Sequence, residues 1–271
     1  MSRCTPGRDG TVNRLLQVCL LRIYKLVVGT GLLSTSWGRS LFYTAYDLYK
    51  SFLEAGDIRP LRRFVVPGGV VIDIGANVGF FTKRFAMWVS DGGFVMAVEP
   101  EAYNVKQLMR TLEKSDTTRV VRVFQGVAAE QSGTLKLAIN PIHPGDHKIS
   151  SKGVNVAAFT IDGLVAMERV TRVCLIKIDV QGAEERVLQG ARATILRDYP
   201  AIYLELDDDA LQLMGSSAAR VTTWLSNFGY LIRRLEKGAL SEPISMAEAV
   251  TICRDCRYTD LLFVKTPITG L

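Results

Sequence analysis

The chain has 271 residues, of which 48% are hydrophobic and 22% charged, close to the averages of globular proteins. This composition excludes intrinsic disorder, a fibrous repeat and a small disulfide-stapled fold, and the length allows a large buried core. Lys and Arg outnumber Asp and Glu by 33 to 27, and this excess is no strong indication of nucleic-acid binding. The five cysteines, an odd number, and the lack of an Asn-x-Ser/Thr acceptor predict a reducing, cytoplasmic location.

The beginning of the chain, residues 1–57, is predicted to be a helical extension in front of one α/β domain over residues 58–271. Residues 13–30 are rich in Leu, Ile and Val, but Arg22 and Lys25 lie near the middle of this run. Two central basic residues offset the apolar gain on insertion, so we expect no membrane-spanning helix. No signal-peptide cleavage pattern follows. We expect a packing helix; the alternative is a helix that lies on a membrane surface.

Beyond the extension, short apolar runs alternate with helical segments. The predicted strands of this series cover 70–74, 94–98, 120–124, 173–178 and 201–206, and the predicted helices cover 79–89, 101–113, 182–197 and 217–228. Extra strands at 134–139 and 154–160 flank a polar loop over 140–153, and strands at 229–234 and 260–264 come last. Strand–helix alternation of this kind predicts parallel βαβ units in an open sheet.

The strongest local signal is a strand-to-helix turn that reads Asp73-Ile74-Gly75-Ala76-Asn77-Val78-Gly79. Open α/β sheets bind ligands at this edge, and glycines let the backbone approach a ligand closely. A dinucleotide fingerprint requires glycine where Asn77 and Phe80 stand, and no Gly-Lys-Ser/Thr of a phosphate loop follows. The pattern instead suits a ligand with an ammonium group and no pyrophosphate, such as S-adenosylmethionine.

Glu99 strengthens this interpretation because it ends the second predicted strand, 24 residues after Gly75. An acidic side chain at that position can accept two hydrogen bonds from a ribose diol. Asp73 or Glu99 alone is compatible with a helix cap or an exposed strand end. Together, at this spacing, they predict a nucleoside-binding site.

Three blocks now carry a resemblance: residues 73–79, Glu99-Pro100 with Asn104, and residues 176–184, which read Ile-Lys-Ile-Asp-Val-Gln-Gly-Ala-Glu. In their order and spacing they resemble the FkbM family of S-adenosylmethionine-dependent methyltransferases, over residues 65–206. The resemblance implies O-methyl transfer to hydroxyls of sugars, glycolipids and polyketide-like natural products. It also implies a Rossmann-like class I methyltransferase fold, α/β, with a mostly parallel seven-stranded sheet and an antiparallel last strand.

The resemblance further implies which residues hold S-adenosylmethionine. They are Asp73, Gly75, Asn77 and Gly79 for the methionine part, Glu99 for the ribose, and Gly126, Val127 and Ala128, after the third strand, near the adenine. The sequence departs from the family pattern at position 181, where Gln stands in place of the more common Glu, and near 112–115, where the usual Asn is missing. Neither departure removes the cofactor site.

Asp179 ends the fourth strand, at the rim where donor and acceptor should meet. Methyl transfer requires an aligned acceptor oxygen, and a general base helps a sugar hydroxyl to react. Asp179 is therefore the first candidate for catalysis. Glu205, at the end of the next strand, and His143 and His147, in the polar loop, are the other candidates. Glu184 is expected to cap the helix that follows the fourth strand.

Two pairs of residues have metal-ligand spacing, Cys253-x-x-Cys256 and His143-x-x-x-His147. A single Cys-x-x-Cys pair is weak support for zinc. We predict no metal site, and two reduced thiols in a loop before the last strand.

Two other functions remain open from the sequence. The first is an RNA ribose 2′-O-methyltransferase, with phosphate contacts from Arg62, Arg63, Arg119, Arg122, Arg233 and Arg234. The basic stretches interleaved with aromatic residues that mark single-strand readers are absent from the sequence. The second is a nucleoside-binding scaffold without catalysis. We expect a small-molecule or glycan acceptor.

Overall fold

The computed structural model describes residues 58–138, 148–149, 153–236, 238–256 and 259–265. The predicted extension over 1–57, with its apolar segment 13–30, lies outside the described residues, and so do His143 and His147. The domain boundary at residue 57 therefore stays a prediction. Of the helices in the described ranges, none has the length and apolar character needed to cross a membrane.

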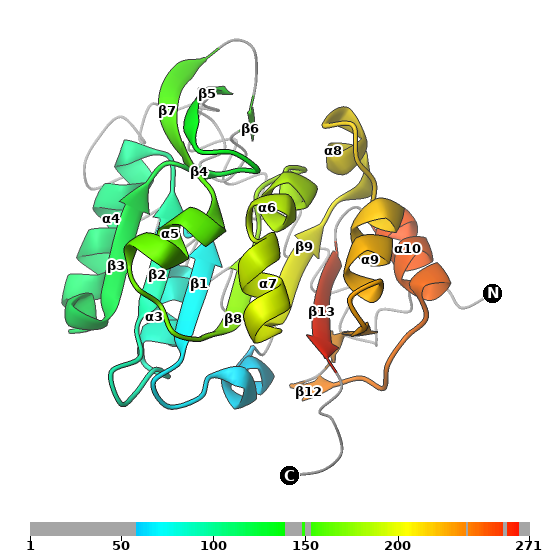
Figure 1. Ribbon diagram of the computed structural model, residues 1–271, viewed down its shortest axis with the longest axis horizontal. Coiled ribbons are helices and arrows are strands. Elements are labelled where there is room, and N and C mark those ends of the chain that lie inside the picture. The colour runs from blue at the N-terminus through cyan, green and yellow to red at the C-terminus, as the bar shows by residue number, and fades with distance from the viewer. Residues whose placement is uncertain (1–57, 139–147, 150–152, 237, 257–258, 266–271) are drawn as a thin grey trace, which may run out of the picture. The chain divides into compact units, whose positions relative to one another are not determined.

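A seven-stranded sheet forms the centre of the described domain (Figure 1), with its strands in the order β10-β13-β9-β8-β1-β2-β3. Their bounds are β1 Val70–Ile74, β2 Val95–Glu99, β3 Val121–Gln125, β8 Val173–Ile178, β9 Ala201–Leu206, β10 Tyr230–Arg233 and β13 Thr259–Lys265. Neighbouring strands are parallel except at β13, which runs antiparallel to both β9 and β10. The predicted fold class is confirmed, including the antiparallel last strand.

Helices cover both faces of this sheet. They are α3 Phe80–Ala86, α4 Ala102–Lys114, α5 Ile161–Met167, α6 Glu184–Gly190, α7 Arg192–Asp198, α8 Asp208–Leu213, α9 Ala218–Ser226 and α10 Met246–Asp255, with 3-10 helices η3 Arg59–Phe64 and η4 Thr118–Val120. Ile72 and Ile176 belong to the larger core, to which α5, α6, α7, α8, α9 and α10 also contribute buried residues. In Figure 1 helices α5, α6 and α7 lie in front of the strands. Leu108 and Leu112 of α4 pack with Ala97 in a separate cluster.

A smaller four-stranded sheet, in the order β4-β7-β5-β6, is inserted between β3 and β8. Its strands are β4 Val127–Ala128, β5 Gly133–Ala138, β6 Lys148–Ile149 and β7 Val154–Phe159, and a two-stranded hairpin, β11 Leu235–Glu236 with β12 Ala239–Leu240, follows β10. Figure 1 shows the small sheet above the end to which the arrows of β1, β8 and β9 point. The two extra strands predicted from the sequence form its β5–β7 pair.

Three helices and one helix break differ from the sequence predictions. The predicted helix over 182–197 is two helices, because α6 ends at Gly190, where a Cβ would lie only 2.0 Å from Ala129 O. Helices α5, α8 and α10 were not predicted. Each has ten residues or fewer, and such short helices give only a weak periodic signal.

The loop predicted around Cys253 and Cys256 was wrong. Cys253 lies inside α10 and is buried, and Cys256 is the C-cap residue of that helix. Ser245 Oγ caps the other end by accepting a hydrogen bond from Glu248 N, 3.2 Å away. Only Ala249 and Cys253 of α10 are buried, so the helix lacks the apolar stripe that would have identified it.

The ends of β1 and β8 are tightly packed against each other at Gly75. Asp179 N donates to Ile74 O at 3.1 Å, and Gly75 has a left-handed backbone with φ +74. A Cβ at Gly75 would lie 1.9 Å from Asp179 O, far inside contact distance. Glycine is therefore required here by the packing of two strand ends.

The substitution Gly75→Ala tests this packing against Gly215→Ala. Gly215 has nearly the same φ, +78, but nothing lies within 4 Å of its Cβ position. Both changes incur the left-handed cost of about 1–2 kcal/mol, and Gly75→Ala should lose a further ~1–3 kcal/mol from the clash. Urea unfolding of the two variants measures the difference. Equal losses of unfolding free energy for the two variants would show that the chain at the end of β8 moves away from the new Cβ at little cost.

Candidate functional site

A pocket lies at the carboxyl edge of the central sheet, where parallel strands end together. Segments after β1, β2, β3 and β8 build most of its wall. The polar and backbone positions that line it include Gly75, Asn77, Glu99, Asn104, Gly126, Val127, Ala128, Asp179 and Gln181. Leu137 of β5 adds an apolar side chain from the smaller sheet. One pocket therefore brings together four segments that lie far apart in the sequence.

Most of the residues predicted for cofactor binding line this pocket, but Asp73 and Gly79 do not. Gly79 is the left-handed N-cap of α3, and a Cβ there would lie 2.6 Å from Leu108 Cδ1 of α4. The glycine thus lets α3 and α4 pack together. Glu205 is also absent from the pocket wall; it is half-buried on β9, opposite Asp260 of β13.

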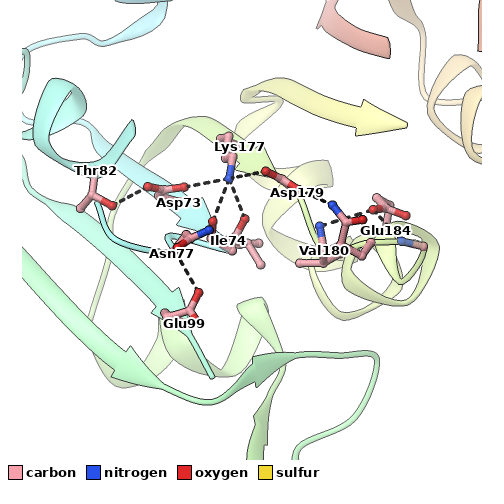
Figure 2. A network of polar contacts seen from close by, with 12 residues as sticks. Asp73, Ile74, Asn77, Thr82, Glu99, Lys177, Asp179, Val180 and Glu184 are labelled. Carbon is pink, nitrogen blue, oxygen red and sulfur yellow. Dashed lines mark hydrogen bonds and ion pairs between the residues drawn. The ribbon is translucent and has the colours of Figure 1, made fainter. Parts of the chain in front are cut away.

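The Glu99 carboxylate is held in one orientation by three donors. Oε2 accepts a hydrogen bond from Asn77 N at 2.9 Å, and Oε1 accepts from Glu101 N at 3.0 Å and Asn104 Nδ2 at 3.1 Å. The residue is 3% exposed. Because hydrogen bonds to a charged acceptor are strong, this arrangement fixes the carboxylate at the junction of the β1 and β2 segments (Figure 2).

Asn77 follows β1 in a left-handed conformation, with φ 50, which asparagine tolerates better than most residues. Its side-chain oxygen Oδ1 is buried and has no hydrogen-bond partner within the described part of the chain. A buried acceptor without a donor costs about 1–3 kcal/mol. Asn77 lines the pocket, so this oxygen is suited to a donor that a ligand supplies.

A charged network lies beneath the pocket and joins β1, α3 and β8 (Figure 2). Thr82 Oγ1 donates to Asp73 Oδ2 at 2.5 Å, and Lys177 Nζ lies 3.5 Å from both Asp73 Oδ1 and Asp179 Oδ2. Burial raises the pKa of Asp73, against the opposing effect of the Lys177 charge. Asp73 is fully buried, so its side chain contacts neighbouring protein residues and not a ligand in the pocket.

Lys177 belongs to this network but was not among the predicted site residues. A signal was available, because it is a charged residue within the strand Val173–Ile178, all of whose residues are buried. A buried ammonium needs oxygen partners, and the strand context shows that they must come from neighbouring strands. The sequence did not show which oxygens these are.

The turn after β8 is held by Glu184. Its Oε1 accepts hydrogen bonds from Gly182 N at 3.0 Å and Val180 N at 3.4 Å, both before α6. The expected capping role was wrong, because Ala183 is the N-cap residue of α6 and no side chain caps that helix. Glu184 is almost fully buried, and burial raises the pKa of this carboxyl to about 7. Val180 lines the pocket, so its hydrogen bond to Glu184 helps to fix the position of the pocket wall.

Comparison with known proteins decides the family. Residues 73–232 match the family model described as Methyltransferase FkbM domain. The chain belongs to the FkbM methyltransferase family. The predicted resemblance is confirmed, and the description of the family model is that of a methyltransferase domain.

Individual relatives of this FkbM chain are distant. Hexuronic acid methyltransferase AglP of Haloferax volcanii is 29% identical over 139 residues, which are 51% of this chain and 56% of that protein. The chain thus matches about half the length of this curated relative. Methyltransferase FkbM from Methylobacillus flagellatus has a TM-score of 0.48 at 17% identity, covering 79% of this chain and 47% of that one. Precorrin-6y C5,15-methyltransferase from Geobacter metallireducens has a TM-score of 0.42 at 14% identity, over 76% and 86% of the two chains.

In this FkbM domain, Gln181, the expected departure from the family pattern, lies beside Asp179. Its Nε2 donates to Asp179 Oδ1 at 3.3 Å, from a left-handed backbone with φ 53. A glutamate would place a second carboxylate beside Asp179 instead of a donor. The departure thus gives Asp179 a neutral hydrogen-bonding neighbour.

The raised pKa of Glu184 predicts a stability that depends on pH. The folded protein holds this proton more tightly than the unfolded chain, so the stabilisation is present below pH 4.5 and is lost as the pH rises through 7. A rise from 4.5 to about 7 corresponds to roughly 3 kcal/mol. Glu184→Gln mimics the protonated form and removes this dependence. Between pH 5 and pH 8, urea unfolding should show a larger decrease in the free energy of unfolding for wild type than for Glu184→Gln. Equal decreases for the two proteins would contradict a raised pKa at Glu184.

Proposed function

We propose that this FkbM methyltransferase transfers a methyl group from S-adenosylmethionine to a hydroxyl of a sugar, glycolipid or polyketide-like natural product. The observation that carries the proposal is a single pocket lined by Asn77, the oriented Glu99 carboxylate and Asp179. The name of the Haloferax volcanii relative, a hexuronic acid methyltransferase, supports a carbohydrate acceptor.

The donor fits the polar groups of the pocket. The Glu99 carboxylate, at the end of β2, would accept hydrogen bonds from ribose hydroxyls. The buried Asn77 oxygen would accept from the ammonium of the methionine part, and the backbone of Gly126–Ala128 would lie along the adenine. When bound, S-adenosylmethionine supplies a methyl group on a positively charged sulfonium.

The acceptor side of the proposed site is the segment after β8. Asp179 lines the pocket with its side chain 17% exposed, so an incoming hydroxyl can reach it. Its carboxylate would orient that hydroxyl and take its proton as the new bond forms. Glu205, which lies away from the pocket wall, and His147, outside the described residues, are weaker candidates for the base.

The RNA alternative has less support from the positions of four of its six arginines. Arg62 and Arg63 precede β1, and Arg119 precedes β3, so they lie toward the amino edge of the parallel sheet, opposite the pocket. Arg122 is paired with Glu168. An RNA-binding surface would need its phosphate contacts around the pocket mouth.

The first test concerns donor binding. Glu99→Gln keeps the size of the side chain but removes its charge, and charged hydrogen bonds typically contribute ~1.5–3 kcal/mol. Calorimetry with S-adenosylhomocysteine should therefore show a dissociation constant about 10- to 100-fold higher. Glu113→Gln, on the exposed side of α4, is the matched control and should bind as wild type does. Unchanged affinity for Glu99→Gln would place the nucleoside elsewhere.

The second test concerns catalysis. Wild type is first screened with labelled S-adenosylmethionine against neutral and uronic-acid glycosides to find an acceptor. With that acceptor, Asp179→Asn should lower kcat by about 10²–10⁴-fold, the usual contribution of a general base, and leave donor affinity nearly unchanged. Glu205→Gln and His147→Ala should lose far less activity. Near-normal turnover by Asp179→Asn, with an inactive His147→Ala, would assign the base to the polar loop instead.

A further inference from the structure

Lys177 is a charge in a place that is otherwise apolar. It is the only charged residue of β8, whose other residues are Val, Cys, Leu and Ile, and it is 3% exposed. Burying an ammonium is costly unless oxygen atoms surround it. A buried ion pair often adds no stability over a well-packed apolar pair, so stability alone is a weak reason for the lysine.

The ammonium of Lys177 contacts two segments of the pocket wall at once. Nζ donates to the carbonyls of Ile74, at 3.3 Å, and Gly75, at 3.0 Å, which end β1 and begin the loop after it. Nζ also lies 3.5 Å from Asp73 Oδ1 and from Asp179 Oδ2. Gly75 and Asp179 both line the pocket. One charged group therefore links the β1 side of the pocket to the β8 side.

The register of the sheet explains why one lysine can do this. Asp73 and Lys177 are direct partners across the parallel pair β1–β8, so both side chains point to the same face. Asp179 lies two residues beyond Lys177, and side chains two apart in an extended chain share a face. The ammonium thus lies between a fully buried carboxylate below and a partly exposed one at the pocket.

The same packing keeps Lys177 from acting on a substrate itself. An ammonium has three N–H donors, and here they are shared among four oxygens, those of Asp73, Ile74, Gly75 and Asp179. The ring of Phe81 in α3 lies 5.0 Å from Nζ and covers another side. The lysine does not line the pocket. Its effect must pass through the groups that it holds.

We propose that Lys177 is a positioning residue for methyl transfer: its ammonium holds the Asp179 carboxylate against the β1 segment and so sets where Asp179 meets the acceptor. This inference rests on the proposed function. Without the ammonium, the Asp179 carboxylate loses the positive charge that attracts it toward the β1 segment. Asp73 is enclosed in the core, so the partly exposed Asp179 is the carboxylate that moves.

The test is a double-mutant cycle in an Asp73→Asn background. The single change Lys177→Met leaves Asp73 buried without its ammonium and can prevent folding, whereas Asp73→Asn with Lys177→Met replaces the buried charges together. In this background Lys177→Met should lower kcat by about 100-fold, as expected when a reacting group is misplaced by about 1 Å. Once Asp179→Asn is also present, Lys177→Met should lower kcat no further, because it acts only through Asp179.

Two further measurements separate positioning from a purely structural role. Thr82→Val removes the other hydrogen bond to Asp73 without touching Asp179; it should lower the melting temperature and leave kcat unchanged. Urea unfolding of the four cycle variants without any ligand should show that the stability losses from Lys177→Met and Asp179→Asn are not additive.

The outcomes are distinguishable. Independent, multiplicative effects on kcat in an active enzyme would overturn the positioning role, and additive unfolding free energies would overturn the Lys177–Asp179 contact. A wild-type chain that transfers no methyl group to any acceptor would overturn the proposed function. The unfolding cycle still reports on the contact in that case.

Discussion

A single buried ammonium, that of Lys177, connects the two strands from which the pocket is built. Strands β1 and β8 lie at the centre of the sheet, and their carboxyl ends carry the donor side and the acceptor side of the proposed site. A charge in this position must be surrounded by oxygen atoms, since burial without partners is costly. The chain meets this requirement with the carboxylates of Asp73 and Asp179 and two carbonyls at the end of β1. The need to satisfy one charge therefore determines how the two sides of the pocket face each other.

The loops around this network adopt conformations that few residues accept. Gly75, Asn77, Gln181 and Gly182 all have positive φ, and they lie in the two turns that follow β1 and β8. Gly75 is confined by Asp179 O, and a Cβ on Gly182 would lie 2.4 Å from Ala210 O. Close packing thus selects the glycines. The side chains at the other two positions contribute polar groups to the pocket wall.

The pocket has two polar ends with different properties. At one end, Glu99 is held by three donors, so it presents a fixed carboxylate. At the other end, Asp179 contacts Lys177 on one oxygen and Gln181 on the other and is partly exposed. A fixed carboxylate suits recognition of a nucleoside, whereas an exposed one can meet a second molecule. This difference supports the assignment of S-adenosylmethionine to the Glu99 end of the pocket and of the acceptor to the Asp179 end.

Much of the fold followed from the sequence alone. The apolar runs of β1, β8 and β9 and the helices between them identified parallel βαβ units, because buried strands leave a continuous hydrophobic signal. The Asp-x-Gly-x-Asn-x-Gly turn and Glu99 marked the pocket, since the carboxyl ends of parallel strands meet at one edge. Short helices such as α10 escaped detection because only Ala249 and Cys253 of that helix are buried.

Only the tertiary structure decided the individual roles around the pocket. The sequence placed Asp73 in a ligand-binding turn, but the alternation of side chains along β1 directs it into the core, toward Thr82 and Lys177. It showed Lys177 as an isolated charge but not its partners, which apart from Asp179 come from β1 and the residue after it, about one hundred residues earlier in the chain. Local patterns record which positions are buried and which backbone turns are required. The contacts that satisfy a buried charge depend on which strands become neighbours, and that is a property of the whole sheet.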